Sequence, residues 1–443
     1  MPDVFGFSGN ILTFIGVLLV LVIGHELGHF VTAKLSGMTV QEFGIGYPPR
    51  LFGVRFRGTD YTVNLLPLGG FVKILGEEDP TEPGSFASKP ALPRIIVLAA
   101  GSTMNALMPV LFLTIAAMLP HTVAIQPLTI TQVAPNSPAL AAGVQIGDQI
   151  TKVNERTVRG LSELEYTLQL NAGGRADFTL HTVSGLDRIV SLPIDLPPSL
   201  VDAGIGLGGP VGILAVSPDS PAERAGIKVG DQIVQVGDTS VRTTADVQRA
   251  TQAAGANEVT FTLKRDGQQV QVQVTPRRDP PPGQGATGIQ IGLASSQVIT
   301  ESLGPLDALG TGVRRAFDIL TLFRNSIYAL FAPHAQDMGP AVTGPIGIAV
   351  ATSEVAKAGF VRLLEWASFL SMNLAIMNIL PIPMLDGGRI LFVLIEVARR
   401  GRRVPPEREA LVHTIGFAVL MTFVVIVSFN DIRMLLSGGN LIR

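Results

Sequence analysis

Cysteine is absent from the 443 residues of the chain, and charged side chains are scarce. Without cysteine there can be no disulfide, no thiolate ligand and no cysteine nucleophile, so histidine and carboxylate groups remain as metal ligands. Charged residues make up 15% of the chain, against about 25% in ordinary soluble domains, whereas apolar residues make up 47%. The formal net charge of -2 gives no indication of nucleic-acid binding. This composition is typical of a membrane protein.

Four apolar runs are long enough to cross a bilayer core, which takes about 20 residues. They lie at about 11–32, 93–119, 363–380 and 410–429. The first run has no basic residue before it and no small-residue cleavage site after it, so we expect a membrane helix and not a signal peptide. The sequence therefore predicts a polytopic α-helical membrane protein with four transmembrane helices.

Basic residues in the short connecting loops predict the orientation of these helices, because such loops stay in the cytoplasm. Five arginines lie between residues 399 and 408, and seven Lys or Arg residues lie between 34 and 94. Both segments are therefore expected on the cytoplasmic side. Both termini and the long section at about 120–360 are then expected outside the cytoplasm.

The first apolar run contains the string His25-Glu26-Leu27-Gly28-His29. Two histidines four positions apart share one face of a helix and can reach one metal ion, and Glu26 can take a proton from the attacking water. An ionisable side chain at bilayer depth costs roughly 2.5–3.5 kcal/mol, so three in one turn indicate a function. The string predicts a metal site in the cytoplasmic half of the membrane.

A candidate third ligand is Asp386, in the run NILPIPMLDGG at 378–388. Catalytic zinc usually has three protein ligands and one open position. Asp386 is an isolated carboxylate in the apolar stretch 363–397, and the two prolines before it cannot continue a helix. Open backbone at membrane depth is tolerated where it is buried in protein or lines a cavity. Counted inward from residue 363, Asp386 reaches the same depth as the histidine pair.

The section outside the cytoplasm contains a duplication. The segment VAPNSPALAAGVQIGDQITKV at 133–153 recurs as VSPDSPAERAGIKVGDQIVQV at 216–236. Alternating segments after each copy predict half-buried strands, and each SPA…AG string predicts a short helix that glycine ends. We expect two small α+β domains at 121–200 and 201–278. The pattern resembles PDZ domains of bacterial proteases, which implies peptide binding by strand addition; a spacer or a size filter over the membrane site fits it too.

The segment 279–360 begins with a Pro/Gly-rich linker. Within this segment, residues 305–332 are apolar but carry three arginines and Asp318. These charges favour a helix lying in the membrane interface over a fifth span. The remaining parts, 1–120 and 361–443, are expected to form the membrane domain, with two spans each.

An HExxH string in a first span, NxxPxPxLDG in a late span and PDZ-like repeats between them resemble the site-2 protease family. The nearest form is the RseP-type bacterial regulated intramembrane zinc metalloprotease with two PDZ domains. The resemblance covers nearly the whole chain. It implies that His25, His29 and Asp386 bind Zn2+ and that Glu26 is the catalytic general base.

The resemblance also implies a substrate-binding groove. Asn378 and Pro381 would hold the substrate strand near the metal. Gly69 and Gly70, in PLGGFVK at 67–73, match a membrane-associated β-loop of the family, which pairs with unwound substrate. One departure is GSTMN at 101–105, where relatives have proline after the glycine, so the resemblance does not carry a role over to Asn105.

Taken together, the resemblance implies a zinc-dependent intramembrane endopeptidase in the bacterial cytoplasmic membrane. Its substrates would be transmembrane segments of single-span proteins, cut after a first cleavage outside the cytoplasm, in regulated intramembrane proteolysis. The implied partners are these substrates, the lipid bilayer and peptides bound by the PDZ-like domains.

Two other classes remain open. A non-enzymatic membrane scaffold would keep the buried ionisable groups for structure and bind no stoichiometric metal. A transporter also has buried ionisable residues and broken helices. The duplicated unit here is soluble and not membranous, which disfavours a transporter.

Overall fold

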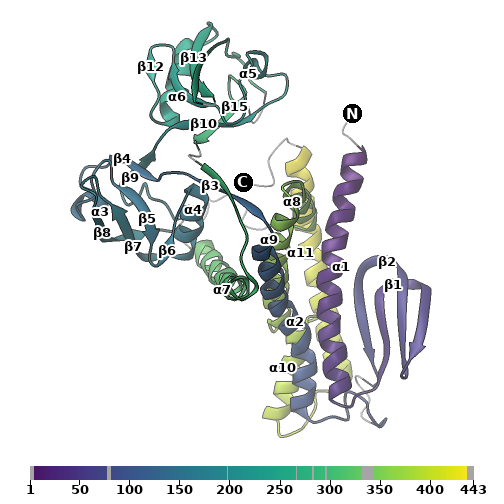
Figure 1. Cartoon of the computed structure of the whole chain (residues 1–443). Coiled ribbons are helices and arrows are strands. Elements are labelled where there is room, and N and C mark those ends of the chain that lie inside the picture. The colour runs from purple at the N-terminus through teal and green to yellow at the C-terminus, as the bar shows by residue number, and fades with distance from the viewer. Residues whose placement is uncertain are drawn as a thin grey trace. The chain divides into compact units, whose positions relative to one another are not determined.

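The computed structural model describes residues 4–76, 81–196, 198–265, 267–281, 284–294, 297–331 and 344–436. It divides into two compact units, shown together in Figure 1 and described here one at a time. The membrane unit comprises Met1–Pro120, Ser302–Phe323 and Pro340–Arg443. The sheet unit comprises His121–Glu301 and Arg324–Gly339.

Four helices of the described chain are long and apolar enough to cross a membrane. They are Leu12–Leu35 within α1 (Val4–Leu35), α2 (Ala91–Met118), α9 (Phe360–Ile379), and Pro406–Met434 within α11 (Pro406–Leu436). The expectation of four spans at these places is confirmed. The chain is a polytopic membrane protein.

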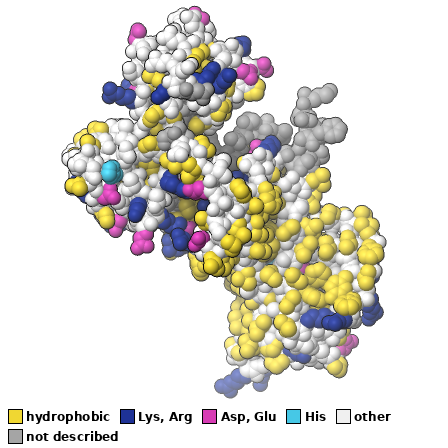
Figure 2. Space-filling view, in the orientation of Figure 1, with side chains coloured by type: hydrophobic (Ala, Val, Ile, Leu, Met, Phe, Trp, Pro, Cys, Tyr) yellow, Lys and Arg dark blue, Asp and Glu magenta, His cyan; other side chains and the backbone are white. Residues whose placement is uncertain are grey.

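The surface of the membrane unit explains why it needs lipid. Figure 2 shows hydrophobic side chains crowded over this part of the molecule. On α11 they point in many directions, as Ile415, Phe417, Val419 and Phe423 are all about half or more exposed. A helix in water keeps a polar face, whereas a helix surrounded by lipid can be apolar all round.

Helix α2 lies between α1 and α9 and packs against both. The short helix α10 (Asp386–Ala398) also packs on α2, where Arg94 and Glu396 form a buried ion pair of 2.7 Å. Helix α8 (Pro345–Lys357) contacts α1, α9 and α11. The Asp431 carboxylate of α11 accepts the N–H groups of Gly344 and Gly347 at the start of α8, where helix amides lack partners of their own.

The apolar stretch 363–397 breaks where its prolines predict. Helix α9 ends at Ile379, and α10 begins at Asp386. Residues 380–385 form an irregular loop because neither proline has an N–H for a helical bond. Asp386 is thus the first residue of a new helix, directly after an opened backbone.

Strands β1 (Val40–Phe56) and β2 (Thr59–Ile74) each fold back on themselves. Gly44 pairs with both Thr62 and Phe71, so residues 40–47 lie between 59–66 and 70–74. Residues 50–56 pair with the other side of 59–64. The result is an antiparallel sheet whose segment 70–74 lies at one edge, and β2 contacts α1.

The sheet unit contains two sheets with the same strand order, β8-β7-β5-β4-β9 and β14-β13-β11-β10-β15. The first comprises β4 (Thr129–Val133), α3 (Pro138–Ala141), β5 (Gln149–Val153), β6 (Arg156–Thr157), α4 (Leu161–Leu170), β7 (Gly174–His181), β8 (Asp187–Ile194) and β9 (Ile205–Gly208). The second comprises β10 (Val211–Val216), α5 (Pro221–Arg224), β11 (Gln232–Val236), β12 (Thr239–Ser240), α6 (Thr244–Ala254), β13 (Val259–Arg265), β14 (Gln268–Val274) and β15 (Ile289–Leu293). The sequence repeat is therefore a structural duplication.

Each sheet has its own hydrophobic core. Phe178 and Phe261 occupy equivalent strands and are completely buried, one in each core. The last strand of each sheet, β9 or β15, begins after residue 200 or 278, where we expected the domains to end. These short strands carry little pattern of their own, and pairing with β4 and β10 brings them into the sheets.

Two further elements flank the duplicated sheets in sequence. Strand β3 (His121–Ile125) pairs antiparallel with β16 (Gln297–Glu301). Helix α7 (Pro305–Leu330) follows β16. Among the described helices, α7 is not one of the four that are apolar enough to cross a membrane. Its location in the membrane interface stays a prediction.

Candidate metal centre

Three side chains from two distant parts of the chain meet in the membrane unit. His25 and His29 lie one turn apart on α1, and their Nε2 atoms are 3.1 Å from each other. Asp386 Oδ2 lies 3.2 Å from His25 Nε2 and 3.3 Å from His29 Nε2. The side chains of His25 and Asp386 are only 12% and 19% exposed. One atom of each residue, Nε2 of either histidine or Oδ2 of the aspartate, therefore faces a common point.

Hydrogen bonds on the far side of each imidazole ring determine which nitrogen faces that point. His29 Nδ1 lies 2.7 Å from the carbonyl oxygen of Val97, and a carbonyl can only accept a hydrogen bond. His29 Nδ1 therefore carries the proton, and its Nε2 presents a lone pair. Such a bond to the second nitrogen is the usual companion of a histidine that binds a metal.

Asn105 of α2 plays the corresponding part for His25. Its side-chain amide lies 3.2 Å from His25 Nδ1, and Asn105 is 1% exposed. With the amide nitrogen toward the ring, Asn105 Oδ1 is buried without a partner. This contact holds the His25 ring with its Nε2 on the side that faces His29 and Asp386.

The donor set fits a metal ion. Asp386 Oδ2 is buried with no hydrogen-bond partner, and one imidazole nitrogen of each histidine lies beside it. A neutral imidazole nitrogen and a carboxylate oxygen are both metal ligands, and a cation between them would satisfy the buried carboxylate. The observed separations are close to the edge of about 3.3 Å expected for a tetrahedral zinc site. The described residues contain this one group suited to a metal: His25, His29 and Asp386.

Gly101 keeps the space beside the ligand atoms open. A Cβ added to Gly101 would lie 2.4 Å from His29 Nε2 and 2.6 Å from His25 Nε2. Any larger residue at this position of α2 would therefore clash with both imidazole rings. The close crossing of α1 and α2 makes this glycine part of the site.

Glu26 is next to the ligand pair in sequence and lies beside the edge of the small sheet. A Cβ added to Gly70 would lie 3.2 Å from Glu26 Cγ and 3.1 Å from Gly44 O. Strand segment 70–74 thus runs past Glu26 with no side chain between them at Gly70. Gly69 packs against the ring of Tyr47, where a Cβ would lie 2.8 Å from Cε2.

The two other predicted substrate-binding residues belong to the C-terminal part of the chain, far in sequence from the small sheet. Asn378 is half-buried in the last turn of α9, and Pro381 is exposed in the loop before Asp386. The structure thus brings His25, His29 and Asp386 into contact and puts Gly70 against Glu26. Asn378 and Pro381 lie on the segment that leads into Asp386.

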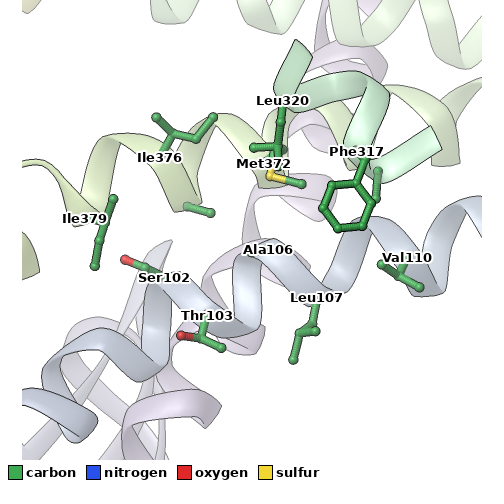
Figure 3. A pocket seen from close by; sticks show the side chains of 12 residues that line it. Ser102, Thr103, Ala106, Leu107, Val110, Phe317, Leu320, Met372, Ile376 and Ile379 are labelled. Carbon is green, nitrogen blue, oxygen red and sulfur yellow. The ribbon is translucent and has the colours of Figure 1, made fainter. Parts of the chain in front are cut away.

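The described residues of the membrane unit line at least two cavities. One of about 300 Å³ is lined by Asp386 together with charged or titratable side chains of α10, α11 and neighbouring segments, among them Arg389, Glu396, Arg403 and His413. The other, of about 480 Å³, is almost wholly apolar; Figure 3 shows side chains such as Leu107, Phe317 and Ile376 around it. Only the first of these two cavities includes a residue of the metal centre.

Four residues of the site went unassigned by sequence reasoning. Gly101 and Asn105 were noticed only as a departure from the family pattern, although a buried amide in a span is itself costly and so a signal. His413 is a lone histidine in the fourth apolar run, and the same cost would have singled it out. Val97 contributes only a backbone carbonyl, which sequence cannot indicate.

Comparisons with known proteins match this chain along nearly its whole length. The family model for peptidase family M50 matches residues 13–423. The zinc metalloprotease RasP of Oceanobacillus iheyensis is 30% identical over 447 residues, which cover 96% of this chain and 99% of that protein. The regulator of sigma-W protease RasP of Bacillus subtilis is 30% identical over 453 residues, covering 97% and 99%. The zinc metalloprotease RasP of Geobacillus kaustophilus is 31% identical over 441 residues, covering 96% and 98%.

Proposed function

The chain belongs to peptidase family M50, the site-2 proteases, and we propose that this zinc metalloprotease cuts the transmembrane segments of single-span membrane proteins. Family membership favours an enzyme over the scaffold and the transporter. The observation that carries the proposal is the convergence of two histidines from a membrane helix with Asp386, with Glu26 beside them.

In this proposal His25, His29 and Asp386 hold the zinc ion and Glu26 is the general base. Zinc, when bound, supplies Lewis-acid activation of a water molecule and of the scissile carbonyl. The Glu26 carboxylate accepts the proton of the attacking water and returns it to the leaving amine. Val97 and Asn105 hold the two imidazoles so that their Nε2 lone pairs stay directed at the ion.

The substrate has to be unwound before it can be cut, because a helix uses its own carbonyls in hydrogen bonds. We propose that it pairs as a strand with the edge segment 70–74 of β2. Gly70 supports this, since its missing side chain leaves the backbone free to approach beside Glu26. Asn378 and Pro381 would hold the strand from the side of the opened loop.

Hydrolysis at membrane depth also needs water. The cavity of about 300 Å³ that reaches Asp386 is lined by arginine and glutamate side chains, which water can solvate. We propose that water enters through it from the cytoplasmic side. The five arginines at 399–408 support that side, because basic loops stay in the cytoplasm.

The same orientation puts the duplicated sheets outside the cytoplasm of a bacterial cell. We propose that they are PDZ-like modules that restrict access to substrates whose outer part has already been shortened. The strand order repeated in both sheets supports a pair of equivalent modules, and β9 and β15 each form one end of a sheet. A sheet edge can accept a peptide as an added strand.

A reconstituted cleavage assay tests the proposed reaction. Two single-span reporters share one transmembrane segment and differ outside it, one with a short tail and the other with a folded domain. We expect cleavage of the short-tailed reporter at a bond within its apolar segment, mapped by mass spectrometry, and none of the bulky reporter. A zinc chelator should stop the reaction and added zinc should restore it.

Cleavage outside the apolar segment, or cleavage that a chelator leaves unchanged, would contradict an intramembrane zinc protease. Equal cleavage of both reporters would contradict only the proposed restriction by the size of the outer part, and not the protease activity. The two results are independent, because the chelator tests the zinc site in the membrane unit. The folded outer domain of the bulky reporter tests access to that site.

Peptide binding by the PDZ-like modules predicts a competition effect. A free peptide with the sequence of the short outer tail should lower the rate of reporter cleavage if it occupies the β9 or β15 edge. A scrambled peptide of the same composition is the control. An unchanged rate at saturating peptide would leave the modules as a size filter that binds no tail.

A further inference from the structure

Helix α11 contacts the loop before Asp386 through two residues one turn apart. The backbone N–H of Met384 donates a hydrogen bond of 2.8 Å to His413 Nδ1. A Cβ added to Gly416 would lie 2.3 Å from Pro383 Cβ, so glycine is what lets the helix approach the loop so closely. These two contacts join the fourth span to the residues that lead directly into Asp386.

The loop has few backbone donors with which to hold its shape. Pro381 and Pro383 lack an N–H, which leaves the amides of three residues. The N–H of Ile382 bonds to Leu380 O over 2.7 Å, and that of Leu385 bonds to Ile382 O over 3.2 Å. Both bonds stay within the loop. Of the described amides at 381–385, the one of Met384 is bonded to another helix.

Met384 also has an unusual backbone conformation. Its φ is 76°, in the left-handed region that residues with a side chain rarely adopt. Such a conformation persists where the surroundings impose it. The His413 ring is itself held in place, with its centroid 5.5 Å from that of Phe392 on α10. His413 therefore offers a fixed acceptor to a loop residue that is not in a relaxed conformation.

The chemistry of this hydrogen bond determines the state of the ring. A backbone N–H can only donate, so His413 Nδ1 has no proton and the ring proton lies on Nε2. His413 is not part of the group formed by His25, His29 and Asp386. Its contact with the site runs through Met384, two residues before the carboxylate.

We infer that His413 is a positioning residue, which together with Gly416 holds loop 381–385 so that Asp386 reaches the two histidines. The inference rests on the proposed role of Asp386 as a zinc ligand. Because the loop continues without a spacer into the first turn of α10, a rotation at Met384 moves the Asp386 carboxylate. Groups that orient a metal ligand in this way change metal affinity by about 10–100-fold when they are removed.

His413→Asn and His413→Leu are a matched pair for testing this role. Asn and Leu have similar size and branching, but only Asn has an acceptor, Oδ1, where histidine has Nδ1. Zinc affinity is measured on the full-length protein in bilayer nanodiscs by competition with a fluorescent chelator. We expect His413→Leu to weaken zinc binding by about 10–100-fold and His413→Asn to stay close to wild type. Thr414→Val, which removes a hydroxyl bonded within α11, should change nothing.

Wild-type affinity in His413→Leu, or equal losses in the Leu and Asn variants, would overturn the inference. Asp386→Ala, measured alongside, separates failure of this inference from failure of the proposed ligand role. If Asp386→Ala also keeps full zinc affinity, Asp386 is not a zinc ligand. If His413→Leu does not insert, hydrogen exchange in the wild-type protein decides. Slow exchange of the Met384 amide supports the bond to His413, and exchange at the rate of an open amide overturns it.

Discussion

Replacement of Glu26 by glutamine is expected to slow cleavage of the short-tailed reporter by about 10²–10⁴-fold, the usual contribution of a positioned general acid–base group. Glutamine has the shape of glutamate, and its aliphatic part can keep the contact with Gly70. It cannot take a proton from water, because its amide is not a base near neutral pH. Zinc content should stay at the wild-type level, since Glu26 is not one of the three converging groups.

The measurement combines the cleavage rate in nanodiscs with metal analysis of the same preparation. Glu365→Gln is the matched control: this carboxylate lies on α9 and pairs with Arg315 at 2.7 Å and Arg362 at 2.9 Å. We expect it to cleave at the wild-type rate. Equal rates for wild type and Glu26→Gln would contradict the role of general base. Loss of zinc in Glu26→Gln would contradict the separation of base from ligands.

Replacement of Asp386 by alanine is expected to lower zinc affinity strongly. The loss should exceed the change of about 10–100-fold that follows removal of a group that only orients a ligand. The Oδ2 atom of Asp386 lies 3.2 and 3.3 Å from the two histidine nitrogens, and no other carboxylate joins them in the described chain. Two neutral histidines alone would hold the cation with no compensating negative charge. Cleavage should fall with zinc occupancy.

Asp386→Asn sharpens this test, because asparagine keeps the shape and an oxygen but not the charge. We expect its zinc affinity to fall between those of wild type and Asp386→Ala. Asp307→Asn, at an exposed position in the first turn of α7, is the control for loss of one aspartate. Membrane insertion is checked by protease protection. Full zinc retention by an inserted Asp386→Ala protein would rule out the three-ligand site.

Much of the fold follows from local sequence patterns. The four spans are runs of apolar residues, and their length is a property of the chain by itself. The duplicated sheets follow from a repeat of 21 residues that each copy continues with the same alternation. The break before Asp386 follows from Pro381 and Pro383, which cannot donate helical hydrogen bonds. All of these depend on neighbours along the chain.

Membership of strands β9 and β15 in their sheets does not follow from local pattern. Each is a short segment that includes glycine, and each becomes a strand by pairing with a partner more than sixty residues earlier in the chain. Sequence reasoning ended the domains before these strands for that reason. Pairing energy between strands exists only once the chain has brought them together.

The sequence by itself determined the membrane class of the chain, its spans, its internal repeat and the kinds of group available for a metal, because composition and periodicity are local. The sequence also offered Asp386 as a third ligand, through its depth and the family resemblance, and the tertiary structure brings it to His25 and His29. Tertiary structure alone decided that Asn105 faces the first imidazole and that His413 accepts the N–H of Met384. These contacts join helices far apart in sequence. They form because helix packing brings these polar groups together away from water, where a buried polar group needs a hydrogen-bond or charge partner.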